Sequence, residues 1–224
     1  MQTIKNKYTV ALGIALIANF LLSLIPVVVL WDPLLKGDIA GTMLSMSQHS
    51  FQAHLAIFLC IVEVVIVAWL GVLLWGLLRK VNPVWAMTAM VFYLLEMVMF
   101  AIGTFSGYAL VHLSSIHATS PGEQLEIIGA VFLKLNGYAE SMAMIPFGIG
   151  GFLFYYLLYK SKALPSWIPI WGFLSVILPF IVVPLSTYGV GIPFFIVFPY
   201  VPFELFLGVY ILIKGLSSKS VIWQ

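Results

Sequence analysis

Four glutamates stand inside long apolar stretches of the chain, where ionisable side chains are rare. They are Glu63, Glu96, Glu140 and Glu204. A charge at the centre of a lipid bilayer costs roughly 2.5–3.5 kcal/mol on insertion scales, so such side chains usually face protein and often mark functional sites. A carboxyl group in this setting binds a proton or a cation, or it accepts hydrogen bonds that hold helices together. We therefore take these four residues as the first candidates for a ligand-binding site.

The histidines offer a second kind of chemistry, either metal binding or acid–base catalysis. His54 and His112 are expected on the same side of the membrane as Glu63 and Glu140, so a lipid-modifying or hydrolytic site built from them is one hypothesis. However, His49 and His54 are five residues apart, a poor spacing for one helix face, and no H-x-x-x-H or H-E-x-x-H motif is present. The chain also lacks a P-loop, a dinucleotide-binding fingerprint and a G-x-S-x-G motif. The sequence thus predicts neither a metal ion nor a cofactor.

The composition indicates which kind of scaffold must position these groups. The chain of 224 residues is 62% hydrophobic and 8% charged, whereas about a quarter of the residues in a soluble domain are charged. Its basic residues are dispersed, which argues against a nucleic-acid partner. The single cysteine, Cys60, excludes an intrachain disulfide. We expect one all-α membrane domain over residues 1–224, surrounded by membrane lipids.

Six stretches are long and apolar enough to cross about 30 Å of hydrocarbon. They are residues 8–31, 55–78, 84–112, 136–159, 165–186 and 193–214. Basic residues gather in alternate gaps between them, as is typical of cytoplasmic loops. These basic residues are Lys5, Lys7, Arg79, Lys80, Lys160, Lys162, Lys214 and Lys219. The pattern predicts an integral six-helix transmembrane bundle with both termini in the cytoplasm.

Glu96 and Glu204 are expected to form the main buried polar site. Counted from the basic ends of the third and sixth spans, their heights differ by roughly 5 Å at 1.5 Å per residue. Gly103 and Gly107 share a helix face with Glu96 and form a G-x-x-x-G pair, which allows close helix packing. At least one of the two acids should be protonated or should meet a donor. The candidate donors are Tyr93, Tyr200 and Tyr210.

Prolines are concentrated in the last two predicted spans, and each proline inside a helix removes a backbone hydrogen bond. They are Pro165, Pro169, Pro179, Pro184, Pro193, Pro199 and Pro202. We therefore expect kinks in the fifth and sixth spans. We also expect that Pro199 and Pro202 leave loose carbonyl groups beside Glu204.

Two further helical segments are indicated outside the six spans. The pattern Ser120-Pro121-Gly122-Glu123 is typical of a helix start. An uninterrupted helix from Pro121 to Tyr159 would be about 57 Å long, which exceeds the hydrocarbon thickness. Such a helix must tilt strongly, protrude outward or break near Gly137. We expect residues 121–134 to form a helix that lies outside the hydrocarbon core. Residues 38–52 allow another short interfacial helix.

Three parts of the chain resemble a known family. Residues 157–167, LLYKSKALPSW, are similar to its LLYRSRLVPRWL junction, and residues 203–208, FELFLG, with Lys214-Gly215 are similar to its FELVLGLWLLVKGF ending. Residues 77–80, LLRK, and 94–96, LLE, fit its middle. The chain thus resembles domain-of-unknown-function family 4386, small bacterial membrane proteins of six to seven spans. The resemblance implies that fold and a bacterial cytoplasmic membrane, but no reaction. The family has an arginine where this chain has Tyr93, so an Arg–Glu96 pair is absent here.

We expect a protein without enzymatic activity that binds or passes a small solute, an ion or a lipid in a polar cavity of the bundle. The candidate ligand-binding residues are Glu96, Glu204, Glu63, Glu140, His54, His112 and Tyr93. Two alternatives are the membrane enzyme described above and a membrane subunit or immunity-type protein whose surface is its function. Convergence of the histidines with Glu63 and Glu140 would favour the enzyme. No internal repeat is evident, which argues against inverted-repeat transporters.

Overall fold

The structure is a computed structural model that describes residues 3–4, 6–187, 189–190 and 200–217. Lys5, Lys219 and residues 193–199 of the predicted sixth span lie outside the described residues. The chain forms two compact units. Unit 1 comprises Met1–Phe20, Ile66–Met97 and Ser141–Gln224, and unit 2 comprises Leu21–Val65 and Val98–Glu140.

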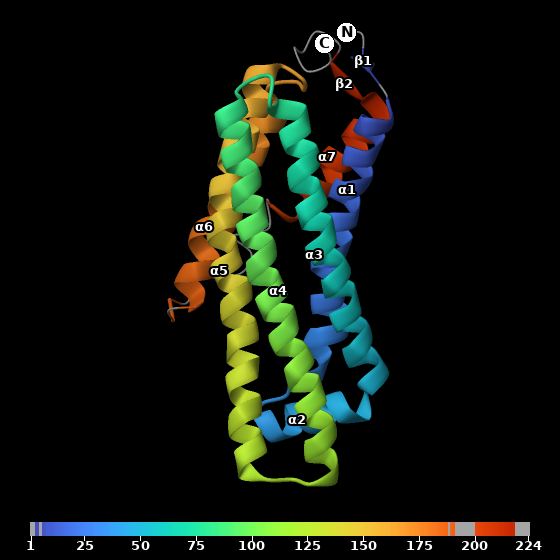
Figure 1. Cartoon of the computed structure of the whole chain (residues 1–224), viewed down its shortest axis with the longest axis vertical. Helices are drawn as coiled ribbons and strands as arrows, with labels where there is room; N and C mark the ends of the chain where they lie inside the picture. Colours follow the sequence, from blue (N-terminus) through green and yellow to red (C-terminus); the bar gives the residue numbers. More distant parts are fainter. Residues whose placement is uncertain (1–2, 5, 188, 191–199, 218–224) are drawn as a thin grey trace. The chain divides into compact units, whose positions relative to one another are not determined.

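Helices make up most of the described chain (Figure 1). The α-helices are α1 (Lys7–Leu24), α2 (Ile39–Gln48), α3 (Ser50–Leu78), α4 (Pro83–Thr119), α5 (Glu123–Ser161), α6 (Trp167–Thr187) and α7 (Val201–Lys214). A π-helix, η1 (Ile25–Trp31), and a 3-10 turn, η2 (Asp32–Leu34), follow α1 directly.

Five of these helical segments are long and apolar enough to cross a membrane. They are Lys7–Leu34, Ser50–Leu78, Pro83–Thr119, Glu123–Ser161 and Trp167–Ser186. The all-helical class and the membrane-type character of the chain are therefore confirmed. Helix α7 has 14 residues, which is shorter than the roughly 20 that a span requires, so the sixth span stays a prediction.

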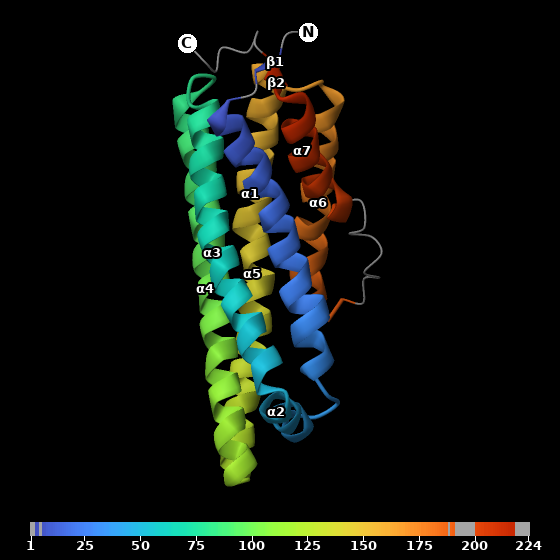
Figure 2. The same ribbon diagram turned by 90° about the vertical axis from the view of Figure 1, so that its right-hand side faces the viewer.

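In unit 1, glycines allow neighbouring helices to approach closely (Figure 2). Helices α1 and α7 run antiparallel, and a Cβ added at Gly208 would lie only 3.0 Å from the carbonyl oxygen of Gly13. Helices α4 and α5 also approach closely, since a Cβ added at Gly150 of α5 would lie 2.8 Å from the Tyr93 ring of α4. A larger side chain at either position would push the helices apart, so these glycines fix which polar groups face each other.

Two short strands join the ends of the described chain within unit 1. Strand β1 (Thr3–Ile4) pairs antiparallel with β2 (Leu216–Ser217) (Figure 1). The sequence did not predict them, because two-residue strands leave no periodic pattern. Their pairing places the N-terminal and C-terminal ends of the described residues beside each other.

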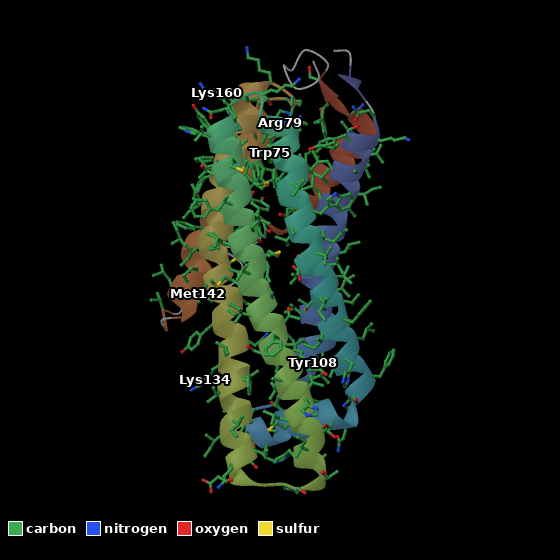
Figure 3. All side chains as sticks on the ribbon, viewed as in Figure 1. Trp75, Arg79, Tyr108, Lys134, Met142 and Lys160 are labelled. Carbon is green, nitrogen blue, oxygen red and sulfur yellow. The ribbon has the colours of Figure 1, made fainter. Side chains whose placement is uncertain are left out.

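Two basic residues lie at the same end of unit 1 as the strands. Figure 3 shows Arg79, at the end of α3, and Lys160, at the end of α5. The Arg79 guanidinium carbon is 5.1 Å from the centroid of the Trp75 ring, and Lys160 Nζ is 5.6 Å from that of Tyr156. Both cations therefore lie over aromatic faces, a favourable arrangement for a charge near an apolar surface.

Unit 2 contains α2, η1, η2, the end of α1 and parts of α3, α4 and α5. The short helix predicted within residues 38–52 is confirmed, and the Asp38 side chain caps it by accepting the Gly41 N–H at 2.7 Å. The predicted G-x-x-x-G contact is also present, since a Cβ added at Gly103 would lie 3.4 Å from Ala139 Cβ of α5. The buried apolar core consists of Trp31, Leu34, Met43, Met46, Ala53, Ala56, Ile57, Leu110 and Val111.

The long helix α5 begins at Glu123, two residues after the predicted start at Pro121. It continues through Gly137 without interruption, so a break near Gly137, one of the three ways considered to fit its length, does not occur. A Cβ added at Gly137 would meet nothing within 4 Å, so no neighbouring element forces a bend there. The tilt of α5 and the position of residues 121–134 outside the hydrocarbon stay predictions.

The prolines of the last two helices lie inside a helix or near its start. Helix α6 continues through both Pro179 and Pro184, and the kinks expected there stay a prediction. Pro202 is the second residue of α7, a position that proline favours at a helix start. Pro199 and the other residues just before Tyr200 lie outside the described residues, so the loose carbonyl groups expected beside Glu204 stay a prediction.

Candidate functional site

Two groups of buried or half-buried polar side chains contain candidate acids, one group in each unit. The group in unit 1, here called the Glu204 cluster, consists of Asn19, Tyr93, Glu96, Tyr155, Tyr200 and Glu204. The group in unit 2, here called the Asn136 pocket, is lined by Val27, Trp31, Ile57, Cys60, Thr104, Asn136 and Glu140. Each group draws its members from several helices, so neither exists before the helices pack.

Glu204 is the best-connected member of the first group. Its side chain is 3% exposed, and its Oε2 accepts a hydrogen bond from Asn19 Nδ2 at 3.1 Å. Tyr200, one turn earlier, also hydrogen-bonds this carboxyl group. Asn19 reaches Glu204 because α1 and α7 are antiparallel and touch at Gly13 and Gly208. Glu204 lies in the first turn of α7, where the helix dipole favours a negative charge.

Glu96 belongs to the same cluster and is 4% exposed. Both acids lie close enough to Tyr93, Tyr155 and Tyr200 to interact with them electrostatically. The prediction that Glu96 and Glu204 face protein is therefore confirmed. Tyr93, which was predicted as a possible donor, is also in the cluster, packed edge-on against an aromatic ring of α5.

Asn19 carries an unsatisfied group. Its side chain is 8% exposed, and its Oδ1 is buried with no hydrogen-bond partner among the described residues. When Glu204 is ionised, a reversed amide would place its oxygen against the carboxylate, so the contact sets this orientation for the charged form. A buried acceptor without a donor costs about 1–3 kcal/mol. The atom therefore marks a place where a proton donor or a cation would be stabilised.

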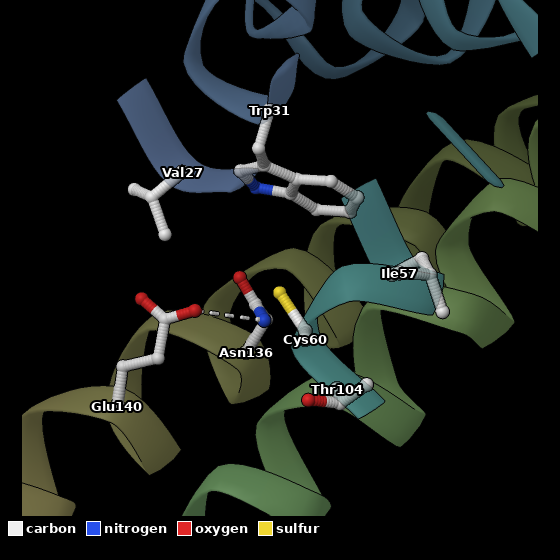
Figure 4. Close-up of a pocket in the computed structure, with 7 residues that line it drawn as sticks. All are labelled: Val27, Trp31, Ile57, Cys60, Thr104, Asn136 and Glu140. Atoms are coloured by element: carbon white, nitrogen blue, oxygen red, sulfur yellow. Dashed lines mark hydrogen bonds between the residues drawn. The ribbon is translucent and has the colours of Figure 1, made fainter. Parts of the chain in front are cut away.

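Asn136 organises the second group. Its Nδ2 donates to the Gly103 carbonyl at 3.0 Å and to Glu140 Oε1 at 3.3 Å. Figure 4 shows Trp31 and Val27, both from η1, on the opposite side of the pocket. The pocket is large enough to hold a water molecule. Polar side chains thus line one side of a small pocket within unit 2, and apolar side chains line the other side.

The candidate histidines lie outside this pocket. His54 is exposed, and its Nδ1 is 2.7 Å from a backbone carbonyl one turn earlier in its own helix. His112 is exposed on α4. Glu140 lines the pocket, and the buried Glu63 interacts electrostatically with Cys60. The structure therefore brings both acids to the surroundings of Cys60, whereas neither histidine lines the pocket.

A metal site is not evident in the part of the chain that the structure describes. No three residues among its histidines, cysteines, aspartates and glutamates are grouped to hold a metal ion. The buried His117 instead pairs with Glu126, with 3.1 Å between Nε2 and Oε1. This contact links the end of α4 to the start of α5.

The family comparison covers both polar groups. A family whose description is "Domain of unknown function (DUF4386)" matches residues 11–215. The chain belongs to the DUF4386 family. This match confirms the resemblance read from the segments around Lys160 and Glu204. Neither a search of curated proteins nor a search of solved structures finds a match to the chain.

In this DUF4386 protein, both polar groups are rich in hydrogen-bond acceptors. Carboxyl and amide oxygens of Glu204 and Asn19 meet in unit 1, and those of Glu140 and Asn136 meet in unit 2. Ionised carboxylates are acceptors only, and an amide oxygen adds two more lone pairs. Such a site stabilises a proton or a small cation far better than an anion.

The two asparagines were not predicted as site residues of this DUF4386 protein. The search for buried chemistry followed ionisable side chains, and asparagine is uncharged. A signal was nevertheless present, because Asn19 interrupts the apolar run of the first span. A buried amide requires hydrogen-bond partners, so each asparagine points to a polar partner on another part of the fold.

Proposed function

We propose that this DUF4386 protein is a six-span protein of the bacterial cytoplasmic membrane that binds a proton or a small cation at the Glu204 cluster and catalyses no reaction. One observation carries the proposal. The buried Oδ1 of Asn19 has no partner among the described residues, and it belongs to the same amide that donates to the Glu204 carboxyl group. A cation or an added proton near this pair would satisfy the amide oxygen and balance the carboxylate.

The topology rests on three features. The five apolar segments support a polytopic membrane protein, and α7 with the residues before it would supply the sixth span. An even number of spans agrees with the pairing of β1 and β2, which holds the two chain ends together. Arg79 and Lys160 lie at that same end of unit 1 (Figure 3), which favours the cytoplasmic side for it and for both termini.

The chemistry of the cluster selects the class of ligand. Glu96 and Glu204 lie near the same three tyrosines, which are Tyr93, Tyr155 and Tyr200. Carboxylates repel an anion, and an apolar ligand would leave the Asn19 acceptor unsatisfied. A proton or a small cation has the opposite effect on both groups. The ligand is therefore positively charged and small.

The test is made on the full chain reconstituted in liposomes, with a pH-sensitive dye inside and either Na⁺ or choline outside. We expect Glu204→Gln to keep the helical circular dichroism spectrum and to abolish cation-dependent pH changes. Infrared difference spectra between acid and alkaline pH should show a carboxyl band in the native chain that Glu204→Gln removes. Glu123→Gln, which neutralises an exposed acid, is the matched control and should keep both signals.

Two results would contradict the proposal. In the first, Glu204→Gln keeps both the flux and the carboxyl band, so that Glu204 only holds helices together. In the second, the native chain shows neither signal although it is folded. A loss of signal in Glu123→Gln as well would show that the effect is one of surface charge, and it would also overturn the assignment.

A further inference from the structure

We propose that the Asn136 pocket of unit 2 binds a single monovalent alkali cation, at a site distinct from the Glu204 cluster. The pocket offers oxygen ligands from two helices, with Asn136 and Glu140 on α5 and Thr104 on α4 (Figure 4). Oxygen ligands suit hard cations, and carboxylate combined with amide and hydroxyl oxygen is a common set for them.

The orientation of Asn136 makes the pocket an acceptor site. Both hydrogens of its Nδ2 have partners, because the nitrogen donates to the Gly103 carbonyl and to Glu140 Oε1. A reversed amide would set its oxygen against these two acceptors, so the assignment of nitrogen and oxygen is fixed. The amide oxygen therefore faces away from both acceptors, toward the pocket, as Figure 4 shows.

The size and charge of the pocket select the cation. Its space suits one water-sized occupant, which excludes an organic ammonium compound or a sugar. Glu140 is the single carboxylate that lines it, whereas calcium requires 6–8 oxygen ligands and usually several carboxylates. One carboxylate with neutral oxygens matches a monovalent ion.

Two further acids lie close by and strengthen the negative potential. Asp32, at the end of η1, interacts electrostatically with Glu140, and the buried Glu63 interacts electrostatically with Cys60. Neither acid lines the pocket. Their negative charges attract a cation toward the site from a distance. They add no ligand atoms, which a divalent ion would need.

The apolar wall of the pocket is held by an unusual element. Trp31 and Val27 both belong to the π-helix η1, where they are four residues apart. Single π-helical turns occur often at functional sites. Gly107 of α4 allows the Trp31 ring to approach, because a Cβ there would lie 3.2 Å from Trp31 Cη2 and 3.0 Å from Ile57 Cδ1. The Trp31 ring thus covers the side of the pocket opposite the oxygens of Asn136 and Glu140 (Figure 4).

The experiment measures the thermal unfolding midpoint of the full chain in lipid nanodiscs while NaCl replaces choline chloride at constant total salt. The midpoint of the native chain should rise with Na⁺, since a ligand that binds only the folded state stabilises it in proportion to ln(1 + [L]/Kd). Glu140→Gln should raise the apparent Kd for Na⁺ about tenfold or more, because it removes the charge. Thr104→Val, which removes one oxygen, should raise it by a smaller factor.

A control variant locates the effect. Glu123→Gln removes an exposed acid of the same helix and should keep the native Na⁺ response. Equal midpoints in NaCl and choline chloride would mean that the pocket holds only water, and this would overturn the proposal. An unchanged response in both Glu140→Gln and Thr104→Val would overturn it as well. If Glu140→Gln does not fold, Thr104→Val decides.

Discussion

Replacing Asn19 with leucine tests whether a proton or a cation occupies the Glu204 cluster in the folded protein. The substitution removes the 3.1 Å hydrogen bond to a carboxyl group that is 3% exposed, so water cannot take its place. A hydrogen bond to a charged group contributes about 1.5–3 kcal/mol. Leucine has the same number and branching of side-chain heavy atoms as asparagine, so the substitution creates no cavity. If a proton or cation satisfies Oδ1 in the folded protein, the full cost of about 1.5–3 kcal/mol should appear.

The opposite expectation follows if nothing satisfies Oδ1. The native chain would then carry a buried unsatisfied acceptor, at a cost of about 1–3 kcal/mol. Asn19→Leu would remove this cost together with the hydrogen bond, and the two effects would nearly cancel. The measured change in the free energy of unfolding therefore distinguishes the two states of the cluster.

A double-mutant cycle with Glu204→Leu tests the reasoning in reversible unfolding in mixed micelles. We expect a coupling energy of about 1.5 kcal/mol or more between Asn19 and Glu204, above the ~0.6 kcal/mol average for interhelical hydrogen bonds in a membrane protein. Thr88→Val provides the control, since Thr88 is exposed and bonds only within α4, and it should be additive with Glu204→Leu. A cost near zero for Asn19→Leu alone would refute a ligand at this site, and additivity of Asn19→Leu with Glu204→Leu would refute the hydrogen bond itself.

The remaining predictions concern packing and topology. Gly208→Ala should lower the free energy of unfolding by about 1–3 kcal/mol, because its Cβ would lie 3.0 Å from a backbone oxygen of the facing helix. Gly137→Ala, where nothing lies within 4 Å, should be neutral or stabilise by up to ~1 kcal/mol, and equal effects at the two glycines would contradict the close contact of α1 with α7. In a Cys60→Ala background, a cysteine at Ser115 should react with an impermeant maleimide in intact cells, and one at Lys80 only after permeabilisation. The reverse pattern would invert the topology and place the histidines in the cytoplasm.

Much of the helical fold was readable from the sequence, because apolar runs bounded by charges or prolines have few alternatives. The burial of Glu96 and Glu204 was predictable for the same reason, since a carboxyl group within such a run must face protein. Asn19 was not found, because its partner is 185 residues away in the chain. Only the antiparallel contact of α1 with α7, made through small residues, brings the two together. No local pattern records that contact.

The Asn136 pocket was also beyond local reasoning. The sequence predicted an unbroken first span to residue 31, whereas the last turns form the π-helix η1. A π-helix shifts the direction of the side chains that follow, so the placement of Trp31 over the pocket depends on a distortion that periodicity does not show.

The two polar groups share one construction, although they lie in different units. In each, an asparagine Nδ2 donates to a glutamate, at 3.1 Å for Asn19 with Glu204 and at 3.3 Å for Asn136 with Glu140. The donor fixes the carboxyl group and directs the amide oxygen elsewhere, so each pair presents acceptors rather than a neutralised contact. A lysine or arginine in place of asparagine would neutralise the glutamate and leave nothing for a ligand to satisfy. The use of a neutral donor beside a buried acid, twice in one chain, is the physical reason to expect positively charged ligands.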